Sequence, residues 1–138
     1  MINIMMVDDD EDDRLMFADA IAETRLICQL TTAVDGQDMI DQLKSMEIAD
    51  QPDLILLDLN MPRMDGREAL EILKNDKRLR LTPVVILTTS NAEEDIIKSY
   101  DCGANSYIPK PVTFDGLREK IVALTDYWFD VVRLPLKK

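Results

Sequence analysis

"DLILLDLNMPRMDG", residues 53–66, is the stretch of sequence that indicates the fold. The apolar run 54–57 leads directly to Asp58, and a turn rich in Asn, Pro, Asp and Gly follows it. A short, continuous apolar run bounded by turn residues is typical of a parallel strand that is covered on both faces. Asp58 is therefore expected at the carboxyl end of a buried strand, at the edge of a loop.

Similar apolar runs recur along the chain and alternate with longer amphipathic stretches. The runs lie at 2–7, 27–33, 54–57, 84–87 and 106–108. Apolar residues recur at helical spacing in the stretches between and after them, in three groups: Leu15, Ala18 and Ala22; Met39, Leu43 and Met46; and Phe114, Leu117, Ile121 and Leu124. This alternation predicts an α/β fold, a single doubly wound parallel sheet of five strands flanked by five helices.

Composition and charge exclude several classes of function. The 138 residues suffice for one domain with a core, and 27 acidic against 16 basic residues give a net charge of -11. Such a charge repels a phosphate backbone, so nucleic-acid binding is not expected. The apolar start is too short for a signal peptide or a membrane span, which predicts a cytoplasmic protein without membrane association. Because the chain has no His, its chemistry must come from carboxylates, hydroxyls, Lys or backbone groups.

Five polar side chains are predicted to converge at one edge of the sheet. Asp8 and Asp9 follow the first strand, Asp58 the third and Lys110 the fifth, while Thr88 ends the fourth. In open parallel sheets, ligands bind beyond the carboxyl ends of the strands. Carboxylates this close cannot all remain ionised without compensation, and Mg²⁺ prefers a few carboxylates plus waters. The pattern predicts a phosphoryl-transfer site, with Asp58 as nucleophile and the metal, Lys110 and Thr88 stabilising the transferred group.

Four blocks of sequence together resemble the receiver domain of two-component response regulators. They match in order and spacing through about residues 2–125, and they are "VDD" (7–9), "LLDLNMPRMDG" (56–66), "ILTTS" (86–90) and "YIPKP" (107–111). The resemblance implies a flavodoxin-like sheet with strand order 2-1-3-4-5. It also implies that Asp58 accepts a phosphoryl group from a phosphohistidine on a sensor histidine kinase. The absence of His from this chain fits that division of roles.

The resemblance further implies a role for individual residues of the site. Asp8, Asp9 and Asp58 are similar to the carboxylates that hold Mg²⁺, with the Asn60 backbone carbonyl as a further ligand. No other cofactor is expected. Asp10 is a candidate outer contributor to this site, whereas Glu11, Asp12 and Asp13 are interpreted as a solvated helix start favoured by the helix dipole.

The remaining matched residues are expected to act as a switch. Lys110 is similar to the lysine that contacts the phosphoryl group, Thr88 to the switch hydroxyl, and Tyr107 to the aromatic residue that changes rotamer with it. The family pattern also implies a cis peptide bond between Lys110 and Pro111. Pro109 departs from the pattern, because it removes one N–H next to Lys110 and leaves the geometry of the last strand open.

Two other functions remain open from the sequence alone. A phosphatase or phosphotransferase with a covalent aspartyl intermediate, of the haloacid-dehalogenase-like type, needs a second Asp two residues after the nucleophile, where this chain has Asn60. A degenerate receiver that only binds partners is disfavoured because Asp8, Asp9, Asp58 and Lys110 are all present. We therefore expect no enzymatic turnover beyond self-phosphorylation and autodephosphorylation at Asp58.

The end of the chain is expected to form an extension. Residues 1–126 are assigned to the receiver domain and 127–138 to a C-terminal tail without an output domain. The tail contains six apolar residues: Trp128, Phe129, Val131, Val132, Leu134 and Leu136. Either it prolongs the last helix and folds back, or it forms a dimer contact, since exposed apolar patches mark interfaces. It resembles the tail of small response regulators that pair with bacterial phytochromes, which implies a homodimer and a light-sensing kinase.

Overall fold

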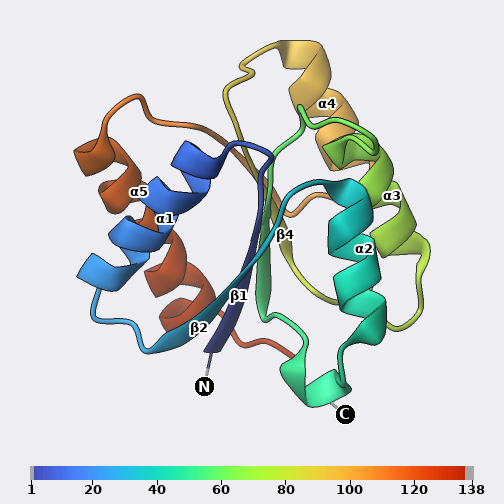
Figure 1. Ribbon diagram of the computed structural model, residues 1–138, viewed down its shortest axis with the longest axis horizontal. Coiled ribbons are helices and arrows are strands. Elements are labelled where there is room, and N and C mark those ends of the chain that lie inside the picture. The colour runs from blue at the N-terminus through green and yellow to red at the C-terminus, as the bar shows by residue number, and fades with distance from the viewer. Residues whose placement is uncertain (1, 136–138) are drawn as a thin grey trace.

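The computed structural model describes residues 2–135, and within them five parallel strands form one sheet in the order β2-β1-β3-β4-β5 (Figure 1). The strands are β1 (Ile2–Val7), β2 (Cys28–Ala33), β3 (Leu54–Leu57), β4 (Val84–Thr88) and β5 (Ser106–Pro109). Each coincides with a predicted apolar run to within one residue at either end. The predicted fold and strand order are confirmed, and the order changes direction between β1 and β3.

Helices cover both faces of the sheet. In Figure 1, α1 (Glu11–Glu23) and α5 (Phe114–Asp126) lie on one side, and α2 (Gly36–Ser45), α3 (Gly66–Asn75) and α4 (Glu93–Asp101) lie on the other. Four of these helices begin after a side chain that accepts a hydrogen bond from a backbone N–H of the first turn, namely Asp10, Asp35, Asp65 and Thr113. These caps fix where each helix starts relative to the strand end before it.

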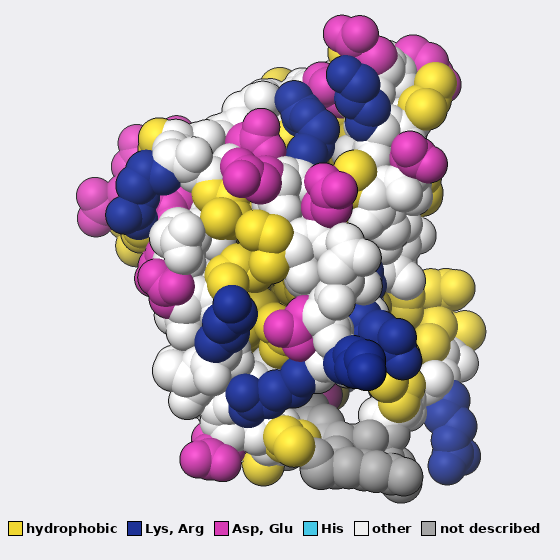
Figure 2. Space-filling view, turned by 90° about the vertical axis from the view of Figure 1, so that its right-hand side faces the viewer, with side chains coloured by type: hydrophobic (Ala, Val, Ile, Leu, Met, Phe, Trp, Pro, Cys, Tyr) yellow, Lys and Arg dark blue, Asp and Glu magenta, His cyan; other side chains and the backbone are white. Residues whose placement is uncertain are grey.

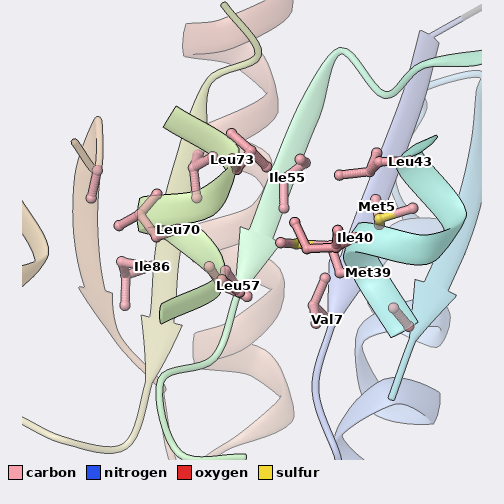
Figure 3. Close-up of a cluster of buried hydrophobic side chains, with 14 of the residues drawn as sticks. Met5, Val7, Met39, Ile40, Leu43, Ile55, Leu57, Leu70, Leu73 and Ile86 are labelled. Atoms are coloured by element: carbon pink, nitrogen blue, oxygen red, sulfur yellow. The ribbon is translucent and has the colours of Figure 1, made fainter. Parts of the chain in front are cut away.

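The sheet separates two hydrophobic layers. Successive residues of β1 point to opposite faces, so Met5 and Val7 pack with α2 and α3 while Ile4 and Met6 pack with α1 and α5. Figure 3 shows the first layer, in which Leu70 and Leu73 of α3 and Met39, Ile40 and Leu43 of α2 lie over strand residues. Both faces of the central strands are thus buried, which explains their continuous apolar sequence.

Helix α1 was predicted correctly as an element, but its predicted buried face is wrong. The expected stripe contained Leu15, which is 57% exposed, and Ala22, which is also exposed. The residues that α1 buries are Phe17, Ala20 and Ile21. This helix has apolar residues around most of its circumference, so spacing alone does not select a face. The face with Phe17 and Ile21 has two large apolar side chains, whereas the expected face has one, Leu15, so burial of the first face gains more and decides the orientation.

The tail continues directly from α5. A short π-helical segment, η2 (Tyr127–Val131), follows α5, and Trp128 and Phe129 pack against the α1–α5 layer. Tyr127 and Val131 remain exposed. The tail therefore folds back in part and leaves an apolar remainder on the surface. Leu136, which was also predicted to take part, lies outside the described residues.

Charge is unevenly distributed over the surface. Figure 2 shows the face that α2, α3 and α4 cover, with Lys and Arg side chains both near its upper end and in its lower half. Acidic side chains gather towards the upper end, where the carboxyl ends of the strands lie in Figure 1. Among the described residues, no helix is both long and apolar enough to cross a bilayer.

Candidate functional site

Strand pairing brings the acidic residues of β1 and β3 together. Val7 is paired with Leu57, and the amide of Asp58 donates to the Val7 carbonyl at 3.0 Å, so the residues that follow both strands lie next to each other. Carboxylate oxygens of Asp8, Asp9 and Asp58 all lie within 4.8 Å of one another. Asp8 and Asp58 are buried, whereas Asp9 is exposed. The structure thus brings the three predicted acidic residues into one cluster with an open side.

Lys110 follows β5 and reaches this cluster from the β4–β5 edge of the sheet. Its backbone N–H donates to the Thr88 carbonyl at 2.7 Å, which fixes it beside the end of β4. Its Nζ lies 2.6 Å from Asp8 Oδ2, 2.8 Å from Asp13 Oδ2 and 3.6 Å from Asp58 Oδ2. The predicted ammonium group is therefore in the site, but its two hydrogen bonds go to Asp8 and Asp13 rather than to Asp58.

The electrostatics of the cluster show incomplete compensation of charge. Burial raises the pKa of Asp8, the Asp58 charge adds to this, and hydrogen bonds from Lys110 and Asp10 oppose it without cancelling it. Burial alone would lower the pKa of Lys110, but hydrogen bonds to Asp13 and Asp8 and the Asp58 charge hold it above its usual range. One ammonium thus faces several carboxylates, and the site has capacity for further positive charge.

The acidic cluster fits a hard divalent cation. Mg²⁺ takes oxygen ligands, commonly one or two carboxylates together with water. Asp8, Asp9 and Asp58 supply carboxylate oxygens at a mutual spacing that one ion can span. The exposed side at Asp9 leaves room for solvent ligands. Asn60, whose backbone carbonyl was predicted as a further ligand, lies exposed in the loop directly after Asp58.

The predicted switch residues occupy two different environments. Thr88 is fully buried at the end of β4, and its Oγ1 has no hydrogen-bond partner among the described residues. Tyr107 is half-buried on β5, and its hydroxyl donates to the Ser90 carbonyl at 2.9 Å. Ser90 Oγ in turn donates to Asp95 Oδ2 at 2.6 Å, so the β4–α4 loop is tied to both β5 and α4. An unpaired buried hydroxyl is costly, which makes Thr88 ready to bond an incoming acceptor.

The loop after Asp58 is held in place by the loop after β2. Asp35 accepts hydrogen bonds from the backbone of Asp38 and from Nε of Arg63, at 2.8 and 2.6 Å. Gly36 N–H donates to the Met64 carbonyl at 3.1 Å. Arg63 has a φ of 62°, which is uncommon for a residue other than glycine. These contacts restrain the β3–α3 loop that follows Asp58.

The end of β5 overturns the expectation of a cis peptide bond and resolves the open question about Pro109. The peptide bond between Lys110 and Pro111 is trans, so the predicted cis bond is wrong. Trans is the lower-energy form even before proline. Pro109 is accommodated because β5 is an edge strand and Pro109 is its last residue, opposite Thr88. The missing N–H therefore leaves the approach of Lys110 intact.

Sequence reasoning missed Asp13, which it interpreted as a solvated helix residue. The Asp10 side chain caps α1 and accepts a bond from the Asp13 amide. The Cα–Cβ bonds of a helix tilt towards its amino terminus, so an acid in the first turn of α1 leans back towards the strand ends. The position of Asp13 in the first turn after a capping residue was the signal that could have identified it.

Comparison with known proteins agrees with this geometry. Residues 4–122 match the response regulator receiver domain. Response regulator Rcp1 of Synechocystis sp. is 33% identical over 96% of this chain and 92% of its own length. The probable methanogenesis regulatory protein FilR2 of Methanothrix harundinacea is 32% identical over 96% of this chain and 86% of its own.

Solved structures extend the similarity to the whole fold. The Mn²⁺-bound form of Rcp1 has a TM-score of 0.87 at 32% identity, covering 99% of this chain and 100% of that one. The phosphorylated cyanobacterial phytochrome response regulator RcpA has a TM-score of 0.90 at 36% identity, covering 98% and 99%. The sequence match, the strand order and the acidic cluster at the carboxyl ends of the strands lead to one conclusion: this chain belongs to the response regulator receiver domain family.

Proposed function

We propose that this chain is a phosphorylation switch that accepts a phosphoryl group on Asp58 from a sensor histidine kinase, with Mg²⁺ bound. One observation carries the proposal: three carboxylates from two strand ends lie within 4.8 Å of one another, with the Lys110 ammonium beside them. RcpA, which is similar over nearly its whole length, is described as phosphorylated. This arrangement suits neutralisation and positioning of a phosphoryl group, which is most of what its transfer requires.

Each residue is assigned a step by its position. A carboxylate oxygen of Asp58 attacks phosphorus, and the new P–O bond forms as the donor's bond to phosphorus breaks. Lys110 moves the short distance from its present place to pair with a phosphoryl oxygen. Thr88 donates its unpaired hydroxyl to another of those oxygens. Burial of Asp58 keeps competing water away from the nucleophile and strengthens these interactions.

The metal is assigned to Asp8, Asp9, Asp58 and the Asn60 carbonyl. When bound, Mg²⁺ supplies positive charge to the oxygens of the transferred group. Asp8 and Asp58 are anchored by backbone bonds at their strands, so two ligands are positioned before the ion arrives. Asp9 is exposed and remains accessible to solvent.

The output of the switch is assigned to the face formed by α4, β5 and α5. Phosphorylation adds negative charge and acceptor oxygens at Asp58, which favours a conformation with Thr88 drawn towards them. Tyr107 is bonded to the loop between Thr88 and α4, so a shift of that loop changes its environment. Residues 1–126 are proposed as the receiver unit, and 127–138 as an extension.

An enzymatic role is disfavoured by the position two residues after Asp58. A phosphatase with an aspartyl intermediate needs a second acid there to protonate the leaving group, and Asn60 cannot supply it. Self-phosphorylation and autodephosphorylation of Asp58 are the reactions that we propose. The acidic net charge argues against a nucleic-acid partner.

We also propose two partners. RcpA is described as a phytochrome response regulator, and its similarity supports a light-sensing histidine kinase as the phosphodonor. The exposed side chains of Tyr127 and Val131 beside α5 support a homodimer through the last helix and the tail. A cytoplasmic location, where the kinase and this chain can meet, completes the proposal.

The test is phosphorylation by acetyl phosphate in the presence of Mg²⁺. Wild type should incorporate one phosphoryl group by mass spectrometry, and Asp58→Asn none, because the amide is not a nucleophile. Asp9→Asn should require a higher Mg²⁺ concentration, while Asp12→Asn, which removes an equal charge outside the cluster, should behave as wild type. Equal labelling of wild type and Asp58→Asn would contradict the proposal. Beryllofluoride that fails to bind with Mg²⁺ would instead indicate a degenerate receiver.

A further inference from the structure

The contact between Asp13 and Lys110 has no role in the chemistry proposed above. The Lys110 ammonium lies within hydrogen-bond distance of Asp13 and Asp8, at 2.8 and 2.6 Å. Its distance to Asp58 Oδ2 is 3.6 Å, which is too long for a hydrogen bond. Lys110 therefore lies on the α1 side of the site, away from the group that is to be phosphorylated.

Asp13 is held in this position by a closed ring of hydrogen bonds. Asp8 Oδ1 accepts from the Asp10 amide at 3.0 Å, and Asp10 Oδ1 accepts from the Asp13 amide at 3.4 Å. Asp13 Oδ2 then accepts from Lys110, which also donates to Asp8 and completes the ring. The helix cap at Asp10 thus aligns the Asp13 side chain with the ammonium, and the contact is built into the start of α1.

A phosphoryl group on Asp58 competes with this ring for the ammonium. Lys110 has three N–H donors, and two of them already point at Asp13 and Asp8. Binding a phosphoryl oxygen across 3.6 Å or more requires the side chain to move towards Asp58. The phosphoryl oxygen and the two carboxylates therefore compete for the position of one ammonium group. The Asp13 carboxylate is only one-third exposed, so its bond to Lys110 is partly protected from water.

We infer that Asp13 is a positioning residue that restrains Lys110 in the unphosphorylated state and must release it when Asp58 is modified. This inference rests on the proposed function, and it concerns the balance between the two states rather than the chemistry itself. Removal of the Asp13 carboxylate should free Lys110 and favour the phosphoryl-bound state.

The neighbouring Asp12 provides a matched control. It lies on the same first turn of α1, it is exposed, and it forms no ion pair with Lys110. A general effect of negative charge on an anionic ligand, or on the helix dipole, is therefore shared by Asp12 and Asp13. Asp13→Ala therefore differs from Asp12→Ala in the loss of the hydrogen bond to Lys110.

The experiment is a titration with beryllofluoride, a phosphoryl analogue, at saturating Mg²⁺, followed by NMR spectra of the backbone amides and of the lysine side chains. Asp13→Ala should lower the midpoint roughly three- to tenfold relative to Asp12→Ala, the range expected from the loss of one partly exposed charge-assisted hydrogen bond. In the free protein, the Lys110 side-chain signal, assigned with Lys110→Arg, should shift towards its bound position in Asp13→Ala only. A purely structural role of Asp13 would not move that signal in the bound direction.

The outcomes separate this inference from the proposed function. Equal midpoints for Asp13→Ala and Asp12→Ala, or a higher midpoint for Asp13→Ala, overturn the role of Asp13 while leaving the switch intact. Failure of wild type to bind beryllofluoride overturns the proposed function itself. Thermal unfolding followed by circular dichroism verifies that both variants are folded at the temperature of the titration.

Discussion

Thr88 illustrates a residue whose stability cost and proposed function have the same origin. Its hydroxyl is buried and has no hydrogen-bond partner among the described residues, and a buried hydroxyl without a partner destabilises a folded state. Thr88→Val keeps the shape and removes that group. We expect urea unfolding to show a gain of about 1 kcal/mol, while the spectral response to beryllofluoride is reduced. A loss of stability instead would show that the hydroxyl is satisfied by water in solution.

The lowered pKa of Asp35 predicts that the stability of the fold depends on pH. Burial would raise the pKa of Asp35, but hydrogen bonds from the Asp38 backbone and Arg63, with the Arg63 charge, hold it below its usual 3.8. The ionised form therefore stabilises the fold above pH 3.8, and this contribution is lost as pH falls through the lowered value. Asp35→Asn should cost about 1 kcal/mol at pH 7, because Arg63 is largely exposed and its ion pair is screened.

The difference in stability between Asp35→Asn and wild type should disappear as the pH is lowered below 3.8. Asparagine also caps helices well, so the substitution tests the charge rather than the cap. Asp65→Asn is the control, because Asp65 caps α3 and has no ion pair with an arginine among the residues described. Urea midpoints measured from pH 7 to pH 2 decide the matter, and a difference that stays constant with pH would contradict the assignment.

At the scale of elements, the junction of β3 and α3 depends on a glycine. A Cβ on Gly66 would lie 2.2 Å from the Asp58 carbonyl oxygen, which is backbone and cannot move aside. Gly66→Ala should therefore lower the free energy of unfolding by more than about 2 kcal/mol and weaken beryllofluoride binding, because Asp58 is displaced. The expected losses appear in urea unfolding and in the titration midpoint.

Gly116→Ala in α5 is the matched control for this junction. Its Cβ would lie 3.0 Å from Pro111 Cβ and from Thr113 Oγ1, and the gain in helix propensity offsets that crowding. We expect its unfolding free energy to stay within about 1 kcal/mol of wild type. Equal effects of the two substitutions would indicate that the β3–α3 junction tolerates a side chain.

At the scale of the whole molecule, the exposed remainder of the tail predicts self-association. Val131 is 72% exposed at the end of the π-helical segment, and a homodimer through α5 and the tail would cover it. Val131→Asp should shift sedimentation from dimer to monomer at micromolar concentration, because a buried unpaired charge is costly. Leu81→Asp, at a site 67% exposed in the α3–β4 loop, should not. A wild type that sediments as a monomer contradicts the dimer.

The sequence by itself determined the strands, the edge of the sheet where the polar residues meet, and the cluster of Asp8, Asp9 and Asp58. These follow from local patterns: continuous apolar runs specify buried parallel strands, and the residue after each run must lie at its carboxyl end. The position of Lys110 beside that cluster follows in the same way, and the ion pair between Lys110 and Asp8 agrees with it.

Only the tertiary structure decided which face of α1 is buried, and that Asp13 and Arg63 have partners. The apolar residues of α1 allow more than one orientation, and packing against α5 and the sheet selects Phe17 and Ile21. Asp13 meets Lys110 across 97 positions of sequence, and Arg63 meets Asp35 across 28. Contacts of this kind depend on how distant elements are packed, so the first-turn position of Asp13 indicates where its side chain leans but does not specify its partner.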